Sequence, residues 1–537
     1  MNGIKFEKPY FRWLFGGMGF HNSEATMTPL ISDKLMNERI LKTFHEIRPS
    51  FSRVFGGFHD WTKDAMNHFA EYYNKTFAKT DTAIYMVPGR APLNETESQM
   101  EEFVNETCDK LEYLLKQKEL KLIQFFCVAN ELSVGNTYAM LAKDLDKFKK
   151  YHQMFWSEFK KRKLDLGLIA TDGSGINEFT EQIEWATQNM DEYTKYYCGH
   201  NYAICEKWED GDFAFDDPEF YNYLYRSFDK VVQITKNKQK RFMLAEFGIH
   251  GRKIYFPPEK SSVMVSDIPS GFYDKKEEAE YALMACVEEL AAMNAGVLCT
   301  AFWTFCDYPN PFLGWNGYSD EAKARYEVGK FSGFGTEMRY NKHGLFKWDE
   351  DGNCSARAAL YSVGLMSKFF KSNSTVLKWT SDNKNLICGG VSNSNGSVSL
   401  CIINLSNTDE KINISIGFDI DKPFRVYEYA CDCVPENEFG DLQPFTTLDK
   451  EVYIEVKPHS LTLLTTDYID RRPETVNNVY VSDTGIVWDA VKDKYHAYYR
   501  VFEDGKQIAS TTAENLSIKV NKNADYKVKS VDRFGNI

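Results

Sequence analysis

The stretch LIQFFCVANEL, residues 122–132, joins an apolar run to an abrupt polar end. The run Leu122–Ala129 is short and bounded, which favours a buried strand over a longer helix. It is almost wholly apolar instead of alternating, as expected of a strand that is covered on both faces. It stops at Asn130 and Glu131, an amide beside a carboxylate. Such an end suits a turn or a helix cap, and it also suits a catalytic acid with a partner carboxylate elsewhere.

Runs of the same kind recur along the first two thirds of the chain. With the first one included they are Trp13–Phe20, Phe51–Phe58, Thr82–Val87, Leu122–Ala129, Leu166–Thr171, Tyr196–Tyr202, Phe242–Phe247 and Val297–Phe305. Each is followed by a loop and then by a segment such as SQMEEFVNETCDKLEYLLKQ (98–117), with apolar residues at helical spacing. Eight strand–helix units predict an α/β protein built on a (β/α)8 TIM barrel.

The pattern changes near residue 372, after a last helical segment at 355–372. Short strands and turns follow, with a hairpin turn expected at Asn393–Gly396. We therefore predict all-β C-terminal domains: a catalytic barrel at 1–372, a β-sandwich at 373–468 and a module at 469–537 that resembles fibronectin type III. Trp488 and Tyr499 would be core aromatics of the last module. The sandwich should pack firmly on the barrel, whereas the module follows the charged segment DRRPETV (470–476) and should touch little.

Composition excludes several classes of function. The net charge is −13, which argues against a nucleic-acid surface, and no apolar stretch approaches the length of a membrane span. The 12 cysteines include no CxxC pair and no zinc-ligand spacing, so we expect neither a metal nor a cofactor. Most lie in apolar runs, which favours free thiols in a reducing compartment. The N-terminal residues do not read as a signal peptide, so a cytoplasmic location is expected. A homo-oligomer is left open.

Two glutamates follow apolar runs directly. Glu131 ends the fourth predicted strand, and Glu246 ends the seventh in RFMLAEFG (241–248). Active sites of such barrels lie at the carboxyl ends of the strands, so both side chains should reach one mouth. Charged residues are seldom buried unless paired. Either glutamate alone is more simply a loop ion pair or a cap, but two at this edge predict a catalytic pair.

These residues give the chain a resemblance to clan A of the retaining glycoside hydrolases. The resemblance covers residues 11 to about 372 and extends to the sandwich. Family 39 is nearest in style, because HGLFKWDEDGNCSARAALYSVGLMSKFF (343–370) is similar to the closing segment of its members. The resemblance implies that Glu131, after Asn130, is the acid/base and that Glu246 is the nucleophile. It further implies substrate-site roles for Arg53, for His200 and Tyr202 of CGHNY (198–202), and for Trp303.

Two more residues near the predicted mouth are candidates for sugar binding. His21 follows the first strand and Trp61 lies in the loop after the second. For both, a loop residue that makes only local contacts is at least as good an interpretation. The same alternative, a packing histidine or a core tryptophan, applies to His200 and Trp303.

The chemistry fits the residues. Hydrolysis of a glycosidic bond needs one protonated and one ionised carboxyl group. Arg53 and the Tyr202 hydroxyl can hold Glu246 ionised, while partial desolvation and repulsion from Glu246 would raise the pKa of Glu131. Asn130 can bond the sugar 2-hydroxyl.

We therefore expect a retaining β-glycoside hydrolase with a carbohydrate or glycoside substrate. Long aromatic loops after the last three strands, which include Trp315 and Tyr318, favour a pocket and exo action. Two alternatives stay open. One is an inactive carbohydrate-binding or scaffold protein on the same fold. The other is a transglycosylase with the same residues.

Overall fold

The structure is a computed structural model. It describes residues 2–9, 14–22, 25, 32–56, 61–88, 96–132, 144–204, 216–250, 275–306, 308–310, 339–341, 344–348, 354–435, 439–448 and 452–537.

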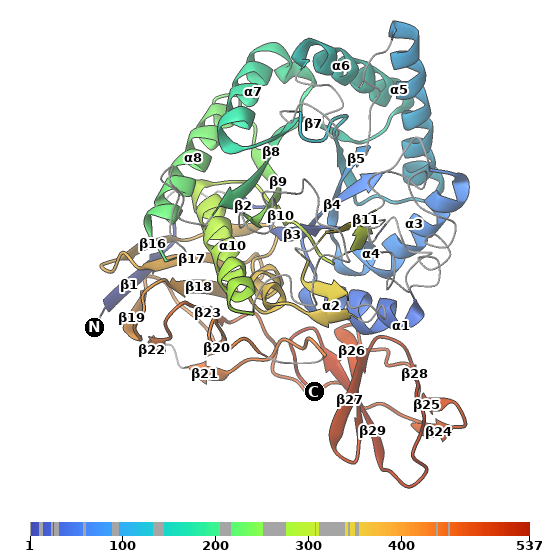
Figure 1. The fold of residues 1–537 in the computed structure, drawn as a ribbon, viewed down its shortest axis with the longest axis vertical. Helices are drawn as coiled ribbons and strands as arrows, with labels where there is room; N and C mark the ends of the chain where they lie inside the picture. Colours follow the sequence, from blue (N-terminus) through green and yellow to red (C-terminus); the bar gives the residue numbers. More distant parts are fainter. Residues whose placement is uncertain are drawn as a thin grey trace.

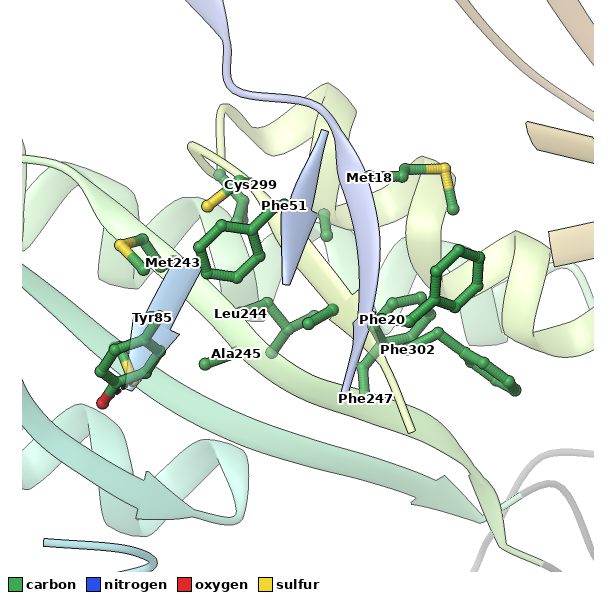
Figure 2. Close-up of a cluster of buried hydrophobic side chains, with 14 of the residues drawn as sticks. Met18, Phe20, Phe51, Tyr85, Met243, Leu244, Ala245, Phe247, Cys299 and Phe302 are labelled. Atoms are coloured by element: carbon green, nitrogen blue, oxygen red, sulfur yellow. Dashed lines mark hydrogen bonds between the residues drawn. The ribbon is translucent and has the colours of Figure 1, made fainter. Parts of the chain in front are cut away.

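Eight parallel strands close into a barrel, which confirms the predicted α/β fold (Figure 1). They are β3 (Met18–His21), β4 (Phe51–Gly56), β5 (Ala83–Pro88), β6 (Ile123–Phe126), β7 (Gly167–Ser174), β8 (Tyr196–Ile204), β9 (Phe242–His250) and β10 (Thr300–Phe302). Each lies in or overlaps one of the eight apolar runs, and β10 pairs with both β9 and β3 to close the ring. Side chains such as Phe51 and Leu244 fill the interior from several strands (Figure 2).

Helices alternate with the strands around the barrel. The main ones are α2 (Lys42–Ile47), α3 (Lys63–Lys75), α5 (Glu97–Glu112), α6 (Leu145–Arg162), α7 (Ile176–Asn189), α8 (Glu219–Lys236), α10 (Lys275–Ala295) and α12 (Leu365–Phe369). The helix predicted from 98–117 is α5 with a π-helical last turn, Tyr113–Gln117. It begins with a capping box in which Thr96 and Gln99 satisfy each other's backbone N–H groups.

Helix α10 is buried on both sides, because it lies between the barrel and the sandwich. Asn294 Nδ2 donates to the Cys388 carbonyl at 2.9 Å, and Leu290 and Met293 lie directly against Gly389 of the sandwich. A side chain at Gly389 would collide with both, so glycine permits the close approach. The sandwich therefore packs firmly on the barrel, as predicted.

The sandwich consists of two sheets (Figure 1). One has the order β16 (Lys378–Ser381), β1 (Asn2–Glu7), β19 (Glu410–Ile416), β22 (Val452–Val456). The other has the order β2 (Leu14–Phe15), β15 (Ser374–Val376), β17 (Leu386–Ser392), β18 (Val398–Asn404), β23 (Ser460–Thr465), β20 (Phe424–Ala430), β21 (Thr446–Leu448). The expected hairpin joins β17 and β18, with Gly396 at a φ of 85°.

The N-terminal strands depart from the predicted domain division, which assigned residues 1–372 to the barrel. Strand β1 pairs with β16 and, in parallel, with β19, and β2 pairs with β15. Ile4 and Phe6 of β1 lie in the core between the two sheets. A strand at the chain's start can reach a sheet built from its end only through tertiary packing, which local sequence does not encode.

The last module has two three-stranded antiparallel sheets. Their orders are β24 (Tyr480–Ser482), β25 (Gly485–Val487), β28 (Asn515–Ser517), and β27 (Lys506–Thr511), β26 (His496–Glu503), β29 (Tyr526–Asp532). Trp488 and Tyr499 are both buried in its core, and their ring centroids lie 5.4 Å apart. The likeness to fibronectin type III stays a prediction.

The expectation that this module touches little is wrong. Thr512 Oγ1 lies 2.8 Å from Asn37 Oδ1, and the His45 ring bonds the Ala497 carbonyl at 3.2 Å. The charged segment 470–476 is also held in place, since Arg471 forms an ion pair with Asp532 of the module. Its charge therefore fixes the module instead of marking a free connection.

Buried charges join the barrel to the C-terminal domains. We call Lys42, Glu46, Lys368, Asp441 and Arg500 the interface cluster. Lys42 Nζ lies 2.7 Å from Glu46 and 3.0 Å from Asp441, Lys368 lies 3.6 Å from Glu46, and Arg500 lies 2.9 Å from Asp441. All five side chains are less than a tenth exposed, so the cluster is sealed by the packing of the three domains.

Free thiols occur as expected in the described part of the chain. Cys127, Cys198, Cys299 and Cys401 are buried and unpaired to any other cysteine. None of the helices that the structure describes combines the length and apolar composition of a bilayer crossing.

Candidate active site

The two predicted carboxylates meet at the carboxyl ends of the barrel strands. Glu246 lies within β9, and Glu131 lies in the turn that follows β6. One carboxylate oxygen of each lies within 4.8 Å of the other. The Glu131 side chain is 17% exposed and that of Glu246 is 4% exposed, so Glu131 is the more open to the mouth. Glu131 has a φ of 51°, and such backbone outliers in non-glycine residues cluster at functional sites.

Arg53 connects three other residues of this site by hydrogen bonds. Its guanidinium donates to Glu246 Oε1, to Asn130 Oδ1 at 2.6 Å and to the carboxylate of Asp172 at 2.7 Å. The Arg53 side chain is fully buried, and its guanidinium lies over the Tyr85 ring at 5.6 Å. Since Arg53 stands in register with Tyr85 on the neighbouring strand, the barrel itself fixes this arrangement.

Asp172 belongs to the site although sequence reasoning missed it. It lies in β7 where the register with β8 shifts between Thr171 and Gly173, and its φ of 59° fits such a bulge. Besides Arg53, it accepts from the Tyr85 hydroxyl at 2.9 Å and from the Cys198 thiol at 2.6 Å. The signal was present, because Asp172 follows the apolar run Leu166–Thr171 directly, as Glu131 follows its own.

His200 and Tyr202 point to the same side of β8, since alternate residues of a strand share a face. Tyr202 donates to Glu246 Oε2 at 2.6 Å. His200 Nε2 lies 3.1 Å from Asp172 Oδ1, and its Nδ1 lies 3.4 Å from both Glu131 Oε1 and Glu246 Oε2. We call Arg53, Glu131, Asp172, His200 and Glu246 the mouth cluster.

His21 and Trp303 flank the cluster. His21 Nδ1 lies 3.3 Å from Arg53 Nη1, and the His21 ring packs on Trp303 with centroids 4.2 Å apart. Trp303 is largely buried, and its ring also packs edge-on against Phe55, with centroids 6.0 Å apart. His21 therefore stands beside Arg53 and Glu246, with its Nδ1 3.9 Å from Glu246 Oε1, and Trp303 lies against His21. Their roles in substrate binding stay predictions.

Trp61 is placed differently. Its ring packs on Phe69 of α3, with centroids 5.3 Å apart, inside the hydrophobic core. A role of Trp61 in sugar binding stays a prediction. The loop aromatics Trp315 and Tyr318 lie outside the described residues.

Burial and charge set the protonation of the cluster. Burial lowers the pKa of His200, but Glu246 and Asp172 together outweigh it and raise that pKa to about 10. Burial would raise the pKa of Asp172, but Arg53 and His200 hold it well below its ordinary value. For His21, burial and then Arg53 lower the pKa, so this imidazole is neutral at pH 7.

The pKa expected for the nucleophile needs a correction. Burial raises the pKa of Glu246 above its ordinary value, although His200, Arg53 and the Tyr202 hydroxyl all oppose the rise. The predicted contacts of Arg53 and Tyr202 are present. Sequence reasoning had assigned the desolvation to Glu131, whereas the strand position of Glu246 makes it the more deeply buried carboxyl group.

Among the described residues, two groups of side chains are close enough together to share a metal ion: Asp172, Cys198 and His200, and Glu131, His200 and Glu246. Both depend on His200, which must lose a proton to bind a metal ion. Arg53 already forms ion pairs with both Asp172 and Glu246. The expectation that the protein uses neither a metal nor a cofactor stays a prediction.

The chain was compared with known proteins. No protein-family model matches it, and no curated protein matches its sequence. Solved structures do match. SrfJ from Salmonella typhimurium is 11% identical with a TM-score of 0.58, over 87% of this chain and 93% of that one. A family 30 xylanase from Clostridium acetobutylicum is 12% identical with a TM-score of 0.55, over 86% of this chain and 99% of that one. A family 51 arabinofuranosidase from Xanthomonas axonopodis pv. citri is 12% identical with a TM-score of 0.52, with the same coverage, 86% and 99%. At such identities the likeness establishes the fold.

Proposed function

We propose that the protein is a retaining β-glycoside hydrolase. The observation that carries the proposal is the pair of carboxylates at the barrel mouth, with oxygens within 4.8 Å of each other. Retaining enzymes hold their two carboxyl groups about 5–5.5 Å apart, and inverting enzymes hold theirs about 6.5–9.5 Å apart to admit a water. The spacing of Glu131 and Glu246 supports the retaining class.

The contacts suggest a role for each residue in a double displacement. Glu246 is the nucleophile, because Arg53 and Tyr202 each bond one of its oxygens and orient the carboxylate. Glu131, the more exposed carboxyl group, protonates the leaving oxygen as the glycosyl–Glu246 ester forms. In the second step it takes a proton from water, which attacks the anomeric carbon and releases Glu246.

Asn130 is suited to hold the substrate. Its Oδ1 accepts from Arg53 at 2.6 Å, which fixes the amide and leaves Nδ2 to donate to a sugar 2-hydroxyl. Such a bond strengthens in the transition state. Trp303 and His21 form the wall beside this position.

The proposal extends to the substrate class, the mode of action and the location. The xylanase and arabinofuranosidase among the solved structures favour a carbohydrate substrate, and they favour families 30 and 51 over a specific likeness to family 39. Exo action rests on the long aromatic loops alone. A cytoplasmic location rests on the free, mostly buried thiols.

Rescue by azide tests the roles of the two glutamates. Glu131→Ala should form the glycosyl-enzyme from a nitrophenyl β-glycoside, since that leaving group needs little protonation, and then accumulate it for want of a base. Azide should restore turnover and give a β-glycosyl azide. In Glu246→Ala azide should attack from the opposite face and give the α product. Glu101→Ala, at an exposed position on α5, is the matched control.

The results separate the alternatives. The same product configuration in both variants would overturn the roles proposed here. A transglycosylase would show the same rescue but would give mainly transfer products when an acceptor sugar is added to the wild type. An inactive scaffold would form no glycosyl-enzyme on any of a panel of nitrophenyl glycosides.

A further inference from the structure

Asp172 and His200 form a buried pair behind the two carboxylates. Both side chains are fully buried, and His200 Nε2 lies 3.1 Å from Asp172 Oδ1. Asp172 also accepts from Arg53, Tyr85 and Cys198. A carboxylate with four donors around it is ionised and can only accept, so His200 must carry a proton on Nε2.

The other ring nitrogen faces the chemistry. His200 Nδ1 lies 3.4 Å from Glu131 Oε1 and 3.4 Å from Glu246 Oε2. An ionised carboxylate on that side can only accept a hydrogen bond, so Nδ1 must also carry a proton. A ring that is protonated on both nitrogens is an imidazolium. The burial of the ring and its contact with Asp172 leave it no freedom to turn away.

We propose that Asp172 is a positioning residue that fixes His200 as an imidazolium, and that its Nδ1–H serves Glu246 and Glu131 in turn. The proposal rests on the proposed function and deepens it. In the free enzyme Glu246 is ionised, and the imidazolium stabilises its charge as an ion pair at 3.4 Å. In the glycosyl-enzyme Glu246 is a neutral ester, and Glu131 is then the carboxylate that must be ionised to act as a base. The Nδ1–H is already aligned for a hydrogen bond with Glu131 Oε1 at 3.4 Å, so the ring can stabilise that charge without turning.

The proton balance is simple. His200 neither gains nor loses a proton over the cycle; Glu131 gives its proton to the leaving oxygen and recovers one from water. His200 therefore stabilises one negative charge at each stage. Arg53 cannot do the same for both carboxylates, since in the described part of the chain its guanidinium bonds Glu246, Asp172 and Asn130 but not Glu131.

The groups that face His200 come from every neighbouring strand. They are His21, Arg53, Tyr85, Glu131, Asp172, Cys198, Tyr202 and Glu246. Among the described residues, Arg53 is the one permanent cation in this set and Asp172 the one carboxylate with a strongly lowered pKa.

The test has two readouts. Histidine labelled with nitrogen-15 reports ring protonation by NMR, and the His200 signal is found by its loss in His200→Gln. In the wild type we expect His200 to stay doubly protonated from pH 6 to pH 8. In Asp172→Asn we expect it to lose the Nδ1 proton within that range. A wild-type His200 that is neutral at pH 7 would overturn the proposal, whatever the protein's activity.

The second readout is the pH profile of kcat/KM. Loss of a positive neighbour raises the pKa of a carboxyl group by about one to three units, so the acidic limb should move up by that much in Asp172→Asn and in His200→Gln. Adding Asp172→Asn to His200→Gln should lower kcat further through Arg53 but should not move the limb again. Hydrolysis of the glycosyl-enzyme should also slow by about tenfold or more, so that it accumulates on activated substrates.

Each outcome can be assigned. An unmoved acidic limb in both single variants would overturn the proposal. If Asp172→Asn does not fold, the NMR of the wild type and the profile of His200→Gln still decide it. If no glycosyl-enzyme forms on Glu246 in the wild type, the proposed function fails, and the NMR readout still judges the Asp172–His200 pair by itself.

Discussion

The mouth cluster and the interface cluster are both groups of five charged or titratable side chains, all of them buried except the partly exposed Glu131, but their carboxyl groups are arranged in opposite ways. In the interface cluster Lys42 stands between the two carboxylates, 2.7 Å from Glu46 and 3.0 Å from Asp441. In the mouth cluster Glu131 and Glu246 approach within 4.8 Å. One cluster separates like charges and the other brings them together.

This difference indicates what each cluster is for. Breaking a buried ion pair leaves an uncompensated charge and is strongly destabilising. The interface cluster should therefore contribute to stability and leave the chemistry untouched. The mouth cluster holds two carboxyl groups that repel each other, an arrangement that proteins keep at functional sites at the expense of stability. Substitutions in the two clusters should thus separate activity from stability.

The largest effect is expected at the mouth. Glu246→Gln removes the nucleophile and should lower kcat by at least about 10³-fold. The unfolding free energy should change by no more than about 1 kcal/mol, because a repulsive contact is lost along with the attractive ones. Hydrolysis of a nitrophenyl β-glycoside and urea unfolding measure the two quantities, with Glu106→Gln on the exposed face of α5 as control. A large loss of stability with activity retained would reverse our assignment of the cluster.

Of the two clusters, the sequence predicted much of the mouth cluster, because its residues follow local patterns. The eight apolar runs located the eight strands, because strands covered on both faces must be apolar throughout. The polar residues at the ends of those runs gave Glu131 and Glu246, and the resemblance to clan A gave Arg53. Asp172 obeys the same rule but was not predicted, because hydrolysis requires only two carboxylates and the sequence does not show that a third one holds Arg53 and His200.

The interface cluster could not be predicted from the sequence. Lys42 bonds the Gly440 carbonyl from a position 398 residues away, and no local pattern links the two segments. Lys42 and Glu46 are also one helical turn apart, which is the spacing of an ordinary exposed salt bridge. Only the packing of the sandwich and the last module over α2 turns that pair into a buried one.

Removal of residues 471–537 should give the second largest effect. It exposes the face of α2 that Ala497 and Tyr498 cover and removes Arg500 from Asp441. We expect the unfolding free energy to fall by about 3–5 kcal/mol, as for a broken buried pair, while kcat/KM per folded molecule stays within about twofold. Thermal unfolding and active-site titration measure both. Turnover lost from a barrel that remains folded would mean that the module contributes to the site.

A single substitution should reproduce part of that loss. Burial would raise the pKa of Asp441, but Lys42 and Arg500 outweigh it and lower that pKa. Asp441→Asn leaves both cations without their shared partner and should cost about 3 kcal/mol of unfolding free energy. Glu71→Gln, on the exposed face of α3, is the control for urea unfolding. An unchanged midpoint in Asp441→Asn would show that the cluster fills space without stabilising the interface.

The smallest effect, measured per pH unit, concerns a buried carboxyl group that belongs to neither cluster. Glu289 of α10 is fully buried, and within the described part of the chain neither of its carboxyl oxygens makes a hydrogen bond of good geometry. Burial raises the pKa of Glu289 to about 8, although the nearby Thr300 hydroxyl weakly opposes the rise. The folded protein therefore holds a proton that the unfolded chain releases near its ordinary pKa of 4.5.

Because the folded-state pKa of Glu289 is raised, its favourable contribution is complete below pH 4.5 and is lost as the pH rises through about 8. Relative to Glu289→Gln, which cannot ionise, the wild type should lose about 1 kcal/mol of unfolding free energy per pH unit between pH 5 and pH 8. Urea unfolding of both proteins at several pH values measures the difference, so that the titration of all other groups cancels. Parallel curves for the two proteins would show that Glu289 is ionised in the folded state and has a partner. A difference that grows with pH would show that Glu289 stays protonated in the folded protein. It would then differ from the interface cluster, where carboxylates are paired with cations, and from the mouth cluster, where two carboxyl groups lie close together for chemistry.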